Sequence, residues 1–236
     1  MKPRPYSFFS RAFSLSVSRY EEQGKYLQKR NTFFDFVDCA RHLAATGWTV
    51  AGAEEGGGAR ASLVSCEGRS AGGLLVGNAL NDAPGLWRAA LAGVPFVDLM
   101  VSMCDASIPL TTGEWEEWGN PNEAAFYDAM RAYSPVDNVR ASTAAYPPLL
   151  ATAGLNDPRV AYWEPTKWTQ RLRAAAPDGG ADVLLKMDMG AGHFSASDRY
   201  KFYRETAYDQ AWLLDQHGLA EPIAAAPAKP AASSSS

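Results

Sequence analysis

The 236-residue sequence has few cysteines, few histidines and no long apolar run, and each shortage narrows the functions it can have. Cys39, Cys66 and Cys104 are an odd number at wide spacings, which argues against a disulfide framework and favours reduced thiols in a core, in an intracellular, cytoplasmic protein. Neither these cysteines nor the three histidines have the spacing of metal ligands, and no cofactor is implied. Because no stretch of about 18 consecutive apolar residues occurs, we expect no transmembrane helix and no membrane partner.

An excess of positive charge is also lacking. The chain has 22 Lys and Arg residues against 26 Asp and Glu residues, a formal net charge of -4. Nothing in this balance would attract a phosphate backbone, so nucleic acid is not expected as a partner. Apolar residues make up 47% of the sequence, which is enough for the core of one domain.

The two ends differ in composition from the middle. Residues 1–20 contain no acidic residue, and their Lys and Arg alternate with Ser and Phe, as in a transit peptide for a chloroplast or mitochondrion. An arbitrary, non-homologous leader upstream of the globular part explains the same composition. Residues 220–236 are mainly Ala, Pro and Ser, and we expect a disordered tail there. Residues 21–219 remain as one folded domain.

Strand-like and helix-like patterns alternate through this domain. Short apolar runs predict strands at 62–66, 89–94, 149–153 and 183–189. Helical spacing of apolar residues predicts helices at 31–47, 73–81, 123–133, 163–176 and 198–216, with a Gly-rich loop at 50–61. Strands that alternate with helices form a parallel sheet flanked by helices, so the predicted class is α/β. In such sheets the functional loops follow the carboxyl ends of the strands.

One of these loops carries a G-x-S-x-G sequence centred on Ser70. It lies directly after a predicted strand and directly before a predicted helix, which is the context of a nucleophile elbow. The turn is tight, so glycines are expected at Gly68 and Gly72. The backbone N–H of Ala71, at the start of the helix, would then stabilise an oxyanion. The alternative is an ordinary Gly-rich turn.

A nucleophilic serine needs a base, and the base needs a carboxylate. Of the three histidines, His42 and His217 lie in or at the end of predicted helices, whereas His193 lies in a Gly-rich loop between the fourth strand and the last helix. Asp157 follows the third predicted strand. The order Ser70, Asp157, His193 is that of the α/β-hydrolases. A structural histidine and an Asp-Pro turn or helix cap are the alternatives for the latter two residues.

Several longer blocks resemble the oligopeptidase B group of the prolyl oligopeptidase family. The resemblance runs from about residue 24 to about residue 214, and its blocks are 66–73, 92–98, 110–122, 157–165 and 192–200. It implies a serine-type endopeptidase with an α/β-hydrolase catalytic domain. This enzyme would cut short peptides after Arg or Lys through an acyl-enzyme on Ser70.

The resemblance also implies the residues that hold the substrate. Glu114 and Glu116 match acidic positions linked to the pocket for the residue before the scissile bond, Phe96 matches its aromatic residue, and we expect Arg159 to bind substrate as well. From the residues alone, carboxylates beside tryptophans suit a long cationic side chain. A solvated acidic loop, with its tryptophans packed on the core, explains the same sequence.

The family's catalytic domain also has upstream strands, an oxyanion tyrosine and a β-propeller, none of which this sequence encodes. We therefore expect a partial sheet with an open edge beside the Ser70 strand. Two further hypotheses follow. One is a catalytically weak or inactive fragment of such a peptidase, and the other is an esterase-like α/β-hydrolase with an open site.

Overall fold

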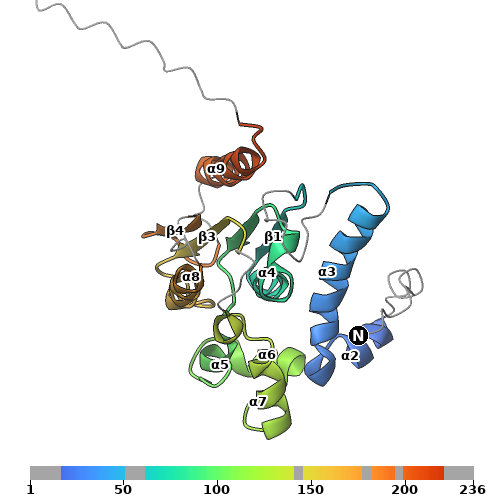
Figure 1. Cartoon of the computed structure of the whole chain (residues 1–236). Coiled ribbons are helices and arrows are strands. Elements are labelled where there is room, and N and C mark those ends of the chain that lie inside the picture. The colour runs from blue at the N-terminus through green and yellow to red at the C-terminus, as the bar shows by residue number, and fades with distance from the viewer. Residues whose placement is uncertain (1–16, 51–61, 141–145, 177–181, 195–198, 221–236) are drawn as a thin grey trace, which may run out of the picture.

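The computed structural model describes residues 17–50, 62–140, 146–176, 182–194 and 199–220. Strands and helices alternate along this part of the chain, which confirms the predicted α/β class (Figure 1). The strands are β1 (Cys66–Arg69), β2 (Ala90–Gly93), β3 (Leu149–Gly154) and β4 (Val183–Asp188). The helices are α2 (Val17–Gln23), α3 (Arg30–Ala45), α4 (Ala71–Asp82), α5 (Leu99–Ser102), α6 (Thr111–Trp118), α7 (Ala124–Arg131), α8 (Trp163–Ala175) and α9 (Arg199–Gln216), with short 3-10 helices η1 (Tyr26–Gln28), η3 (Pro84–Leu86) and η4 (Val136–Asn138). Most of the expected leader and tail, and the loop at 51–61, lie outside the described residues.

The four strands form one parallel sheet in chain order. Its register places Cys66 beside Ala90, Ala90 beside Leu149, and Leu149 beside Val183. Since every strand points the same way, the loops that follow β1, β3 and β4 leave from the same edge of the sheet. These are the loops that contain Ser70, Asp157 and His193.

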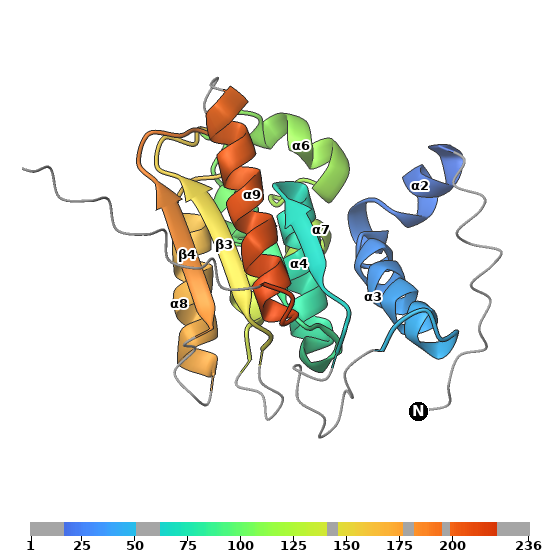
Figure 2. The same ribbon diagram turned by 90° about the horizontal axis from the view of Figure 1, so that it is seen from above.

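Helices cover both faces of the sheet. Helices α4 and α8 lie on one face, and α9 lies across the other (Figures 1 and 2). Helix α3 lies beside α4 on the β1 side of the molecule, while α5, α6 and α7 lie beyond α4 and α8, away from α9 (Figure 1). The arrangement buries β2 completely, because it has a neighbouring strand on each side and a helix layer on each face.

Two apolar clusters fill the space between these elements. The larger lies between the sheet, α3, α4 and α8, and its largest fully buried side chains are Trp87 and Trp168. The smaller joins α3, α4, α6 and α7 through Phe33, Phe96 and Trp118. Helix α3 contributes to both clusters because its buried residues recur at helical spacing.

The predicted strand at 62–66 is wrong in position. Residues 62–65 lie before the strand, and β1 runs from Cys66 to Arg69, directly into Ser70. The apolar run was misleading because Leu63 is 58% exposed, whereas pairing with β2 fixes the strand at a polar, glycine-containing sequence. The other strands and the predicted helices occur within a few residues of their expected bounds.

The sequence patterns did not predict α2, α5 and α6, and two of the three cysteines lie outside the core that was expected to hold them. Helix α6 is the acidic, tryptophan-containing segment for which the apolar pattern predicts no helix. The alternative interpretation, a solvated loop with its tryptophans packed on the core, is therefore wrong about the loop, but Trp118 is buried in the core as that interpretation expects. Cys66 is buried, as expected for a core thiol, but Cys39 and Cys104 are exposed; all three are free.

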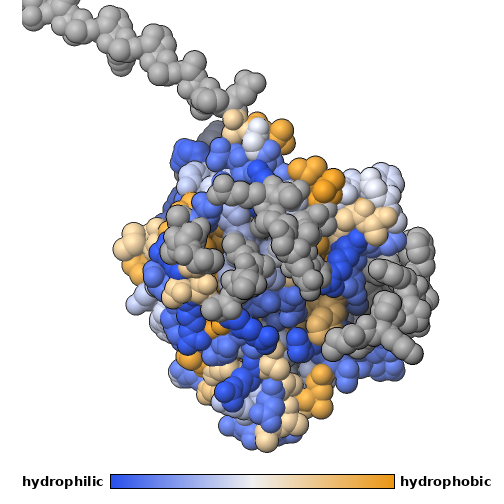
Figure 3. All heavy atoms as spheres, in the orientation of Figure 1, coloured by the Kyte–Doolittle hydropathy of each residue, from blue (hydrophilic) through white to orange (hydrophobic). Residues whose placement is uncertain are grey.

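The surface in Figure 3 carries separate hydrophobic spots among hydrophilic side chains. Helix α9 has no buried residue in the described part, and Tyr200 and Tyr203 are among its exposed large hydrophobic side chains. No helix among the described residues is long and apolar enough to cross a membrane.

A buried carboxylate from α8 holds the segment that follows Phe96. Glu164 is 1% exposed, and one of its oxygens accepts the N–H groups of Val97 and Asp98 at 3.0 and 2.9 Å. Its other oxygen accepts the hydroxyl of Ser102 at 2.6 Å. Burial raises the pKa of Glu164 to about 7, despite these three donors.

This raised pKa predicts a pH-dependent stability. The pKa of Glu164 is about 7 in the folded chain and about 4.3 in the unfolded chain. Its contribution to stability is therefore fully present below about pH 4.3 and is lost as the pH rises through about 7. Glu164→Gln keeps the acceptor but cannot ionise, so the variant should gain stability relative to the native chain between pH 5 and pH 8. Glu164→Ala leaves two buried N–H groups unpaired and should lose about 2 kcal/mol or more at either pH. Urea unfolding at several pH values measures both, and a Glu164→Gln difference that does not change with pH would contradict this account.

Candidate active site

Ser70 occupies a sharp turn between β1 and α4. Its φ of 56° and ψ of -119° are unusual for a residue other than glycine. The turn is held by its backbone, since Ser70 N–H donates to Gly93 O at 2.9 Å and Ser70 O accepts the N–H of Phe96 at 3.1 Å. Ser70 is half-buried at the carboxyl end of β1, and its hydroxyl has no hydrogen-bond partner among the described residues. The strand, turn and helix are those that the G-x-S-x-G sequence predicts.

The glycines of this turn have different roles. A Cβ on Gly68 would lie 2.1 Å from the carbonyl oxygen of Gly72, and a Cβ on Gly73 would lie 2.4 Å from the side chain of Pro95. A Cβ on Gly72 would meet nothing within 4 Å. The expectation that both Gly68 and Gly72 must lack bulk is therefore correct for Gly68 and wrong for Gly72. The second crowded position is Gly73, where α4 passes against the loop after β2.

His193 and Asp157 lie together at the same edge of the sheet. His193 Nδ1 is 2.8 Å from Asp157 Oδ2, and the two residues are only 6% and 8% exposed. The other oxygen of Asp157 accepts the N–H groups of Arg159 and Val160 at 2.8 and 2.9 Å. The loop backbone thus holds one carboxylate oxygen and leaves the other for the imidazole.

Backbone contacts join the loops that carry these residues. Asn156 N–H donates to Ala191 O at 3.0 Å, and a Cβ on Gly154 would lie 2.6 Å from that same oxygen, so the two loops are in close contact. Arg69, next to Ser70, donates from its guanidinium to His193 O at 2.6 Å. The Ser70 turn is therefore tied directly to the histidine loop. No motif in the sequence marks this role of Arg69.

Asp188, at the end of β4, shapes the histidine loop. Its Oδ1 accepts the N–H groups of Gly190 and Ala191 at 2.9 and 3.1 Å, and its Oδ2 is 2.5 Å from Lys201 Nζ on α9. The Lys201 hydrogen bond and these backbone donors lower the pKa of Asp188 to about 2. Asp188 therefore stays ionised at any pH near neutrality. A carboxylate near the end of the strand predicted at 183–189 was the signal that the sequence offered.

The other two histidines lie elsewhere. His42 is on α3, and His217, just past α9, has its Nε2 2.8 Å from the hydroxyl of Ser65. Within the described part of the chain, His193 is the histidine that lies beside a carboxylate at the carboxyl edge of the sheet. The Ala71 N–H is at the first position of α4, where a helix offers no acceptor of its own.

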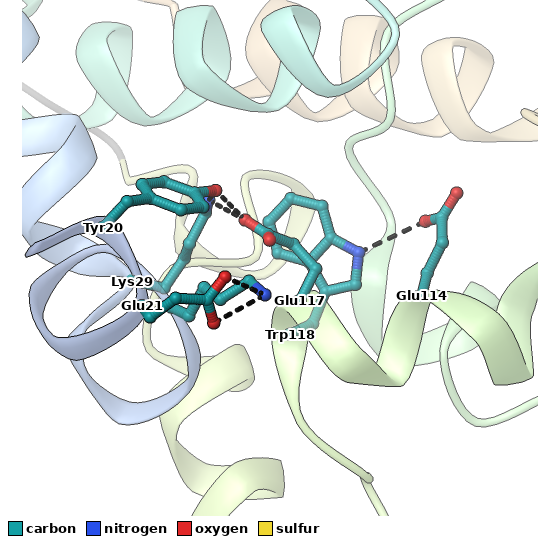
Figure 4. A network of polar contacts seen from close by, with 7 residues as sticks. Tyr20, Glu21, Lys29, Glu114, Glu117 and Trp118 are labelled. Atoms are coloured by element: carbon teal, nitrogen blue, oxygen red, sulfur yellow. Dashed lines mark hydrogen bonds and ion pairs between the residues drawn. The ribbon is translucent and has the colours of Figure 1, made fainter. Parts of the chain in front are cut away.

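The four expected substrate-binding residues lie in two places. Phe96 is 5% exposed, and its ring centroid is 5.9 Å from that of Trp118 on α6. The Trp118 indole N–H donates to Glu114 at 3.2 Å (Figure 4). Glu116 is exposed. Arg159 lies apart from them, with its guanidinium 5.7 Å from the Phe194 ring centroid.

A parallel sheet with a serine at a sharp strand-to-helix turn, and an acid–histidine pair on later loops of the same edge, defines the α/β-hydrolase fold. The comparisons with known proteins agree. The model of the prolyl oligopeptidase family matches residues 17–220, and the chain belongs to this family. The family match includes all the strands and helices described above.

The similar proteins are much longer than this chain. Protease 2 of Moraxella lacunata is 44% identical over 84% of this chain and 27% of its own length. The structure of oligopeptidase B from Leishmania major superposes with a TM-score of 0.78 at 51% identity, over 89% of this chain and 27% of that one. Oligopeptidase B from Trypanosoma brucei, with covalently bound antipain, gives a TM-score of 0.75 at 57% identity, over 87% of this chain and 27% of that one. This chain thus spans about a quarter of the relatives that it matches.

Proposed function

We propose that this chain carries the catalytic triad of a serine endopeptidase that cuts short peptides after Arg or Lys. Ser70 is the nucleophile, His193 the general base and Asp157 the acid. The observation that carries the proposal is the hydrogen bond between buried His193 and Asp157, at the sheet edge where Ser70 stands in a strained turn. Membership of the prolyl oligopeptidase family supports it.

The reaction follows from this geometry. Asp157 accepts the Nδ1–H of His193, which leaves Nε2 free to take the Ser70 proton while Oγ bonds to the scissile carbonyl carbon. The Ala71 N–H stabilises the oxyanion. When the C–N bond breaks, His193 gives its proton to the leaving amine, and Ser70 keeps the acyl group. Water, deprotonated by His193, then attacks the acyl-enzyme and releases the peptide and Ser70.

The preference for Arg or Lys is supported by the contacts between α6 and the turn. Phe96 N–H binds the Ser70 carbonyl, its ring packs on Trp118, and Trp118 holds Glu114. The half-buried carboxylate of Glu114 is therefore connected to Ser70 through Trp118 and Phe96. A carboxylate beside aromatic rings favours a cationic side chain through ion pairing and cation–π attraction. Glu116 and Arg159, which are exposed, would contact the substrate from the rim.

Labelling with a fluorophosphonate tests the triad. The whole 236-residue chain should become modified at Ser70, and Ser70→Ala should abolish the modification. The relative from Trypanosoma brucei with covalently bound antipain supports this expectation. Mass spectrometry of the digested chain locates the adduct. A folded chain that stays unmodified would favour the inactive fragment, and a labelled chain that cleaves esters of Arg but no peptide would favour the esterase-like hydrolase.

A further inference from the structure

A buried lysine joins the N-terminal helices to α6. Lys29, between η1 and α3, is 5% exposed, and its ammonium forms an ion pair with Glu117 (Figure 4). It also donates to the Tyr20 hydroxyl at 3.1 Å and lies 4.8 Å from the ring centroid of Trp118. The Tyr20 hydroxyl in turn donates to Glu117, and burial together with Glu117 raises the pKa of Tyr20. A cation, a carboxylate, a phenol and an indole thus form one cluster.

The contacts of this cluster give two carboxylates of α6, Glu117 and Glu114, different roles. The chain's own lysine neutralises Glu117, so this carboxylate is not available to a cationic substrate. Glu114 lies at the other edge of the same indole, where it accepts the Trp118 N–H. The indole therefore meets Lys29 with its ring face and Glu114 with its N–H (Figure 4).

The indole is fixed on both sides. Its ring packs against Phe96 on the side of the Ser70 turn, and Trp118 is 5% exposed. Lys29 forms an ion pair with Glu117, the residue before Trp118, and so holds the turn of α6 that carries the indole. A small shift of this turn would move the Glu114 carboxylate, because the indole N–H orients it.

We propose that Lys29 is a positioning residue for the binding of a cationic substrate. By holding Glu117 and the face of Trp118, it fixes the indole that orients Glu114. Lys29 itself contacts no substrate. This inference rests on the proposed function, in which Glu114 faces the Arg or Lys side chain.

The test compares two changes on the same N-terminal segment. Removing Lys29 alone would leave a part-buried carboxylate unpaired, so the variant used is Lys29→Met with Glu117→Gln, which removes both charges. Lys25→Met is the matched control, because it breaks an ion pair with Glu21 that is nearer the surface. Thermal unfolding shows that each variant is folded before it is assayed.

Binding and kinetics are then measured separately. Benzamidine, a cationic probe, is titrated by calorimetry into each variant in a Ser70→Ala background, so no catalysis is needed. We expect the double variant to bind benzamidine about tenfold more weakly, in the range typical of residues that share one hydrogen-bond network. In the active chain the KM for an Arg ester should rise by a similar factor at unchanged kcat, while the KM for a Met ester stays constant. Lys25→Met should change none of these values.

The outcomes separate this inference from the proposed function. Any of three results would overturn the role of Lys29. These are unchanged benzamidine affinity in the folded double variant, equal losses for Arg and Met esters, and no benzamidine binding to any chain. If the chain cleaves no substrate but benzamidine binding still depends on Lys29, the positioning role stands and the proposed catalysis fails. If the native chain and the double variant cleave after Arg equally well, the proposed function stands and the inference fails.

Discussion

Asp157→Asn should lower kcat for an Arg substrate by about 10⁴-fold while the chain stays folded. In the native chain Oδ2 accepts the Nδ1–H of His193, and Oδ1 accepts the N–H groups of Arg159 and Val160. In the variant the amide oxygen keeps the backbone donors, and the amide NH₂ faces the imidazole. The imidazole then protonates at Nε2, and it can no longer take the proton of Ser70.

Steady-state kinetics with an Arg ester measures this loss, and thermal unfolding shows that the variant is folded. Asp188→Asn is a suitable comparison, because Asp188 lies at the same edge of the sheet and also accepts two backbone N–H groups, yet it contacts Lys201 rather than His193. Its effect on kcat should be far smaller. A folded Asp157→Asn chain with near-native kcat would show that Asp157 is only a loop cap.

Gly68→Ala should destabilise the chain severely, whereas Gly72→Ala, four residues away, should not. The added Cβ at Gly68 would lie 2.1 Å from a backbone oxygen, and neither backbone segment can move without disrupting β1 or α4. We expect a loss of about 3 kcal/mol in the free energy of unfolding. At Gly72 the space is open within the first turn of α4, so alanine should raise the stability by about 0.5–1 kcal/mol.

Urea unfolding of the two variants at the same pH checks this pair. Gly68→Ala should also lose fluorophosphonate labelling, because the displaced turn moves the Ser70 hydroxyl. Equal stability of the two variants would contradict the packing described for the turn. Gly73→Ala should resemble Gly68→Ala, since its Cβ would lie 2.4 Å from Pro95.

The sequence predicted the parts of the fold that depend on local pattern. The α/β class, the helices with regular apolar spacing and the loops after the strands all follow from periods of two and 3.6 residues. β1 was misplaced because its polar sequence is a strand only through pairing with β2. Helix α6 was missed for a similar reason, since its helical structure is supported by tryptophans that pack on residues distant in the sequence.

The candidate site divides in the same way. The order of Ser70, Asp157 and His193 and the resemblance to a family could be recognised in the sequence, and the structure brings the last two into hydrogen-bond contact. Contacts between distant residues could not be recognised. Arg69 reaches the carbonyl of a residue 124 positions away, and Lys29 reaches a carboxylate 88 positions away. No local motif records such a contact, because it depends on how the whole chain packs.

The central claim is that Asp157 acts on Ser70 only through His193. The measurement is the rate of fluorophosphonate labelling of four proteins: the native chain, Asp157→Asn, His193→Ala and the variant with both changes. Residues that act as one unit lose activity non-additively, so the variant with both changes should react within about twofold of His193→Ala alone. If the two losses multiply instead, Asp157 and His193 act independently, and the account of this site is wrong.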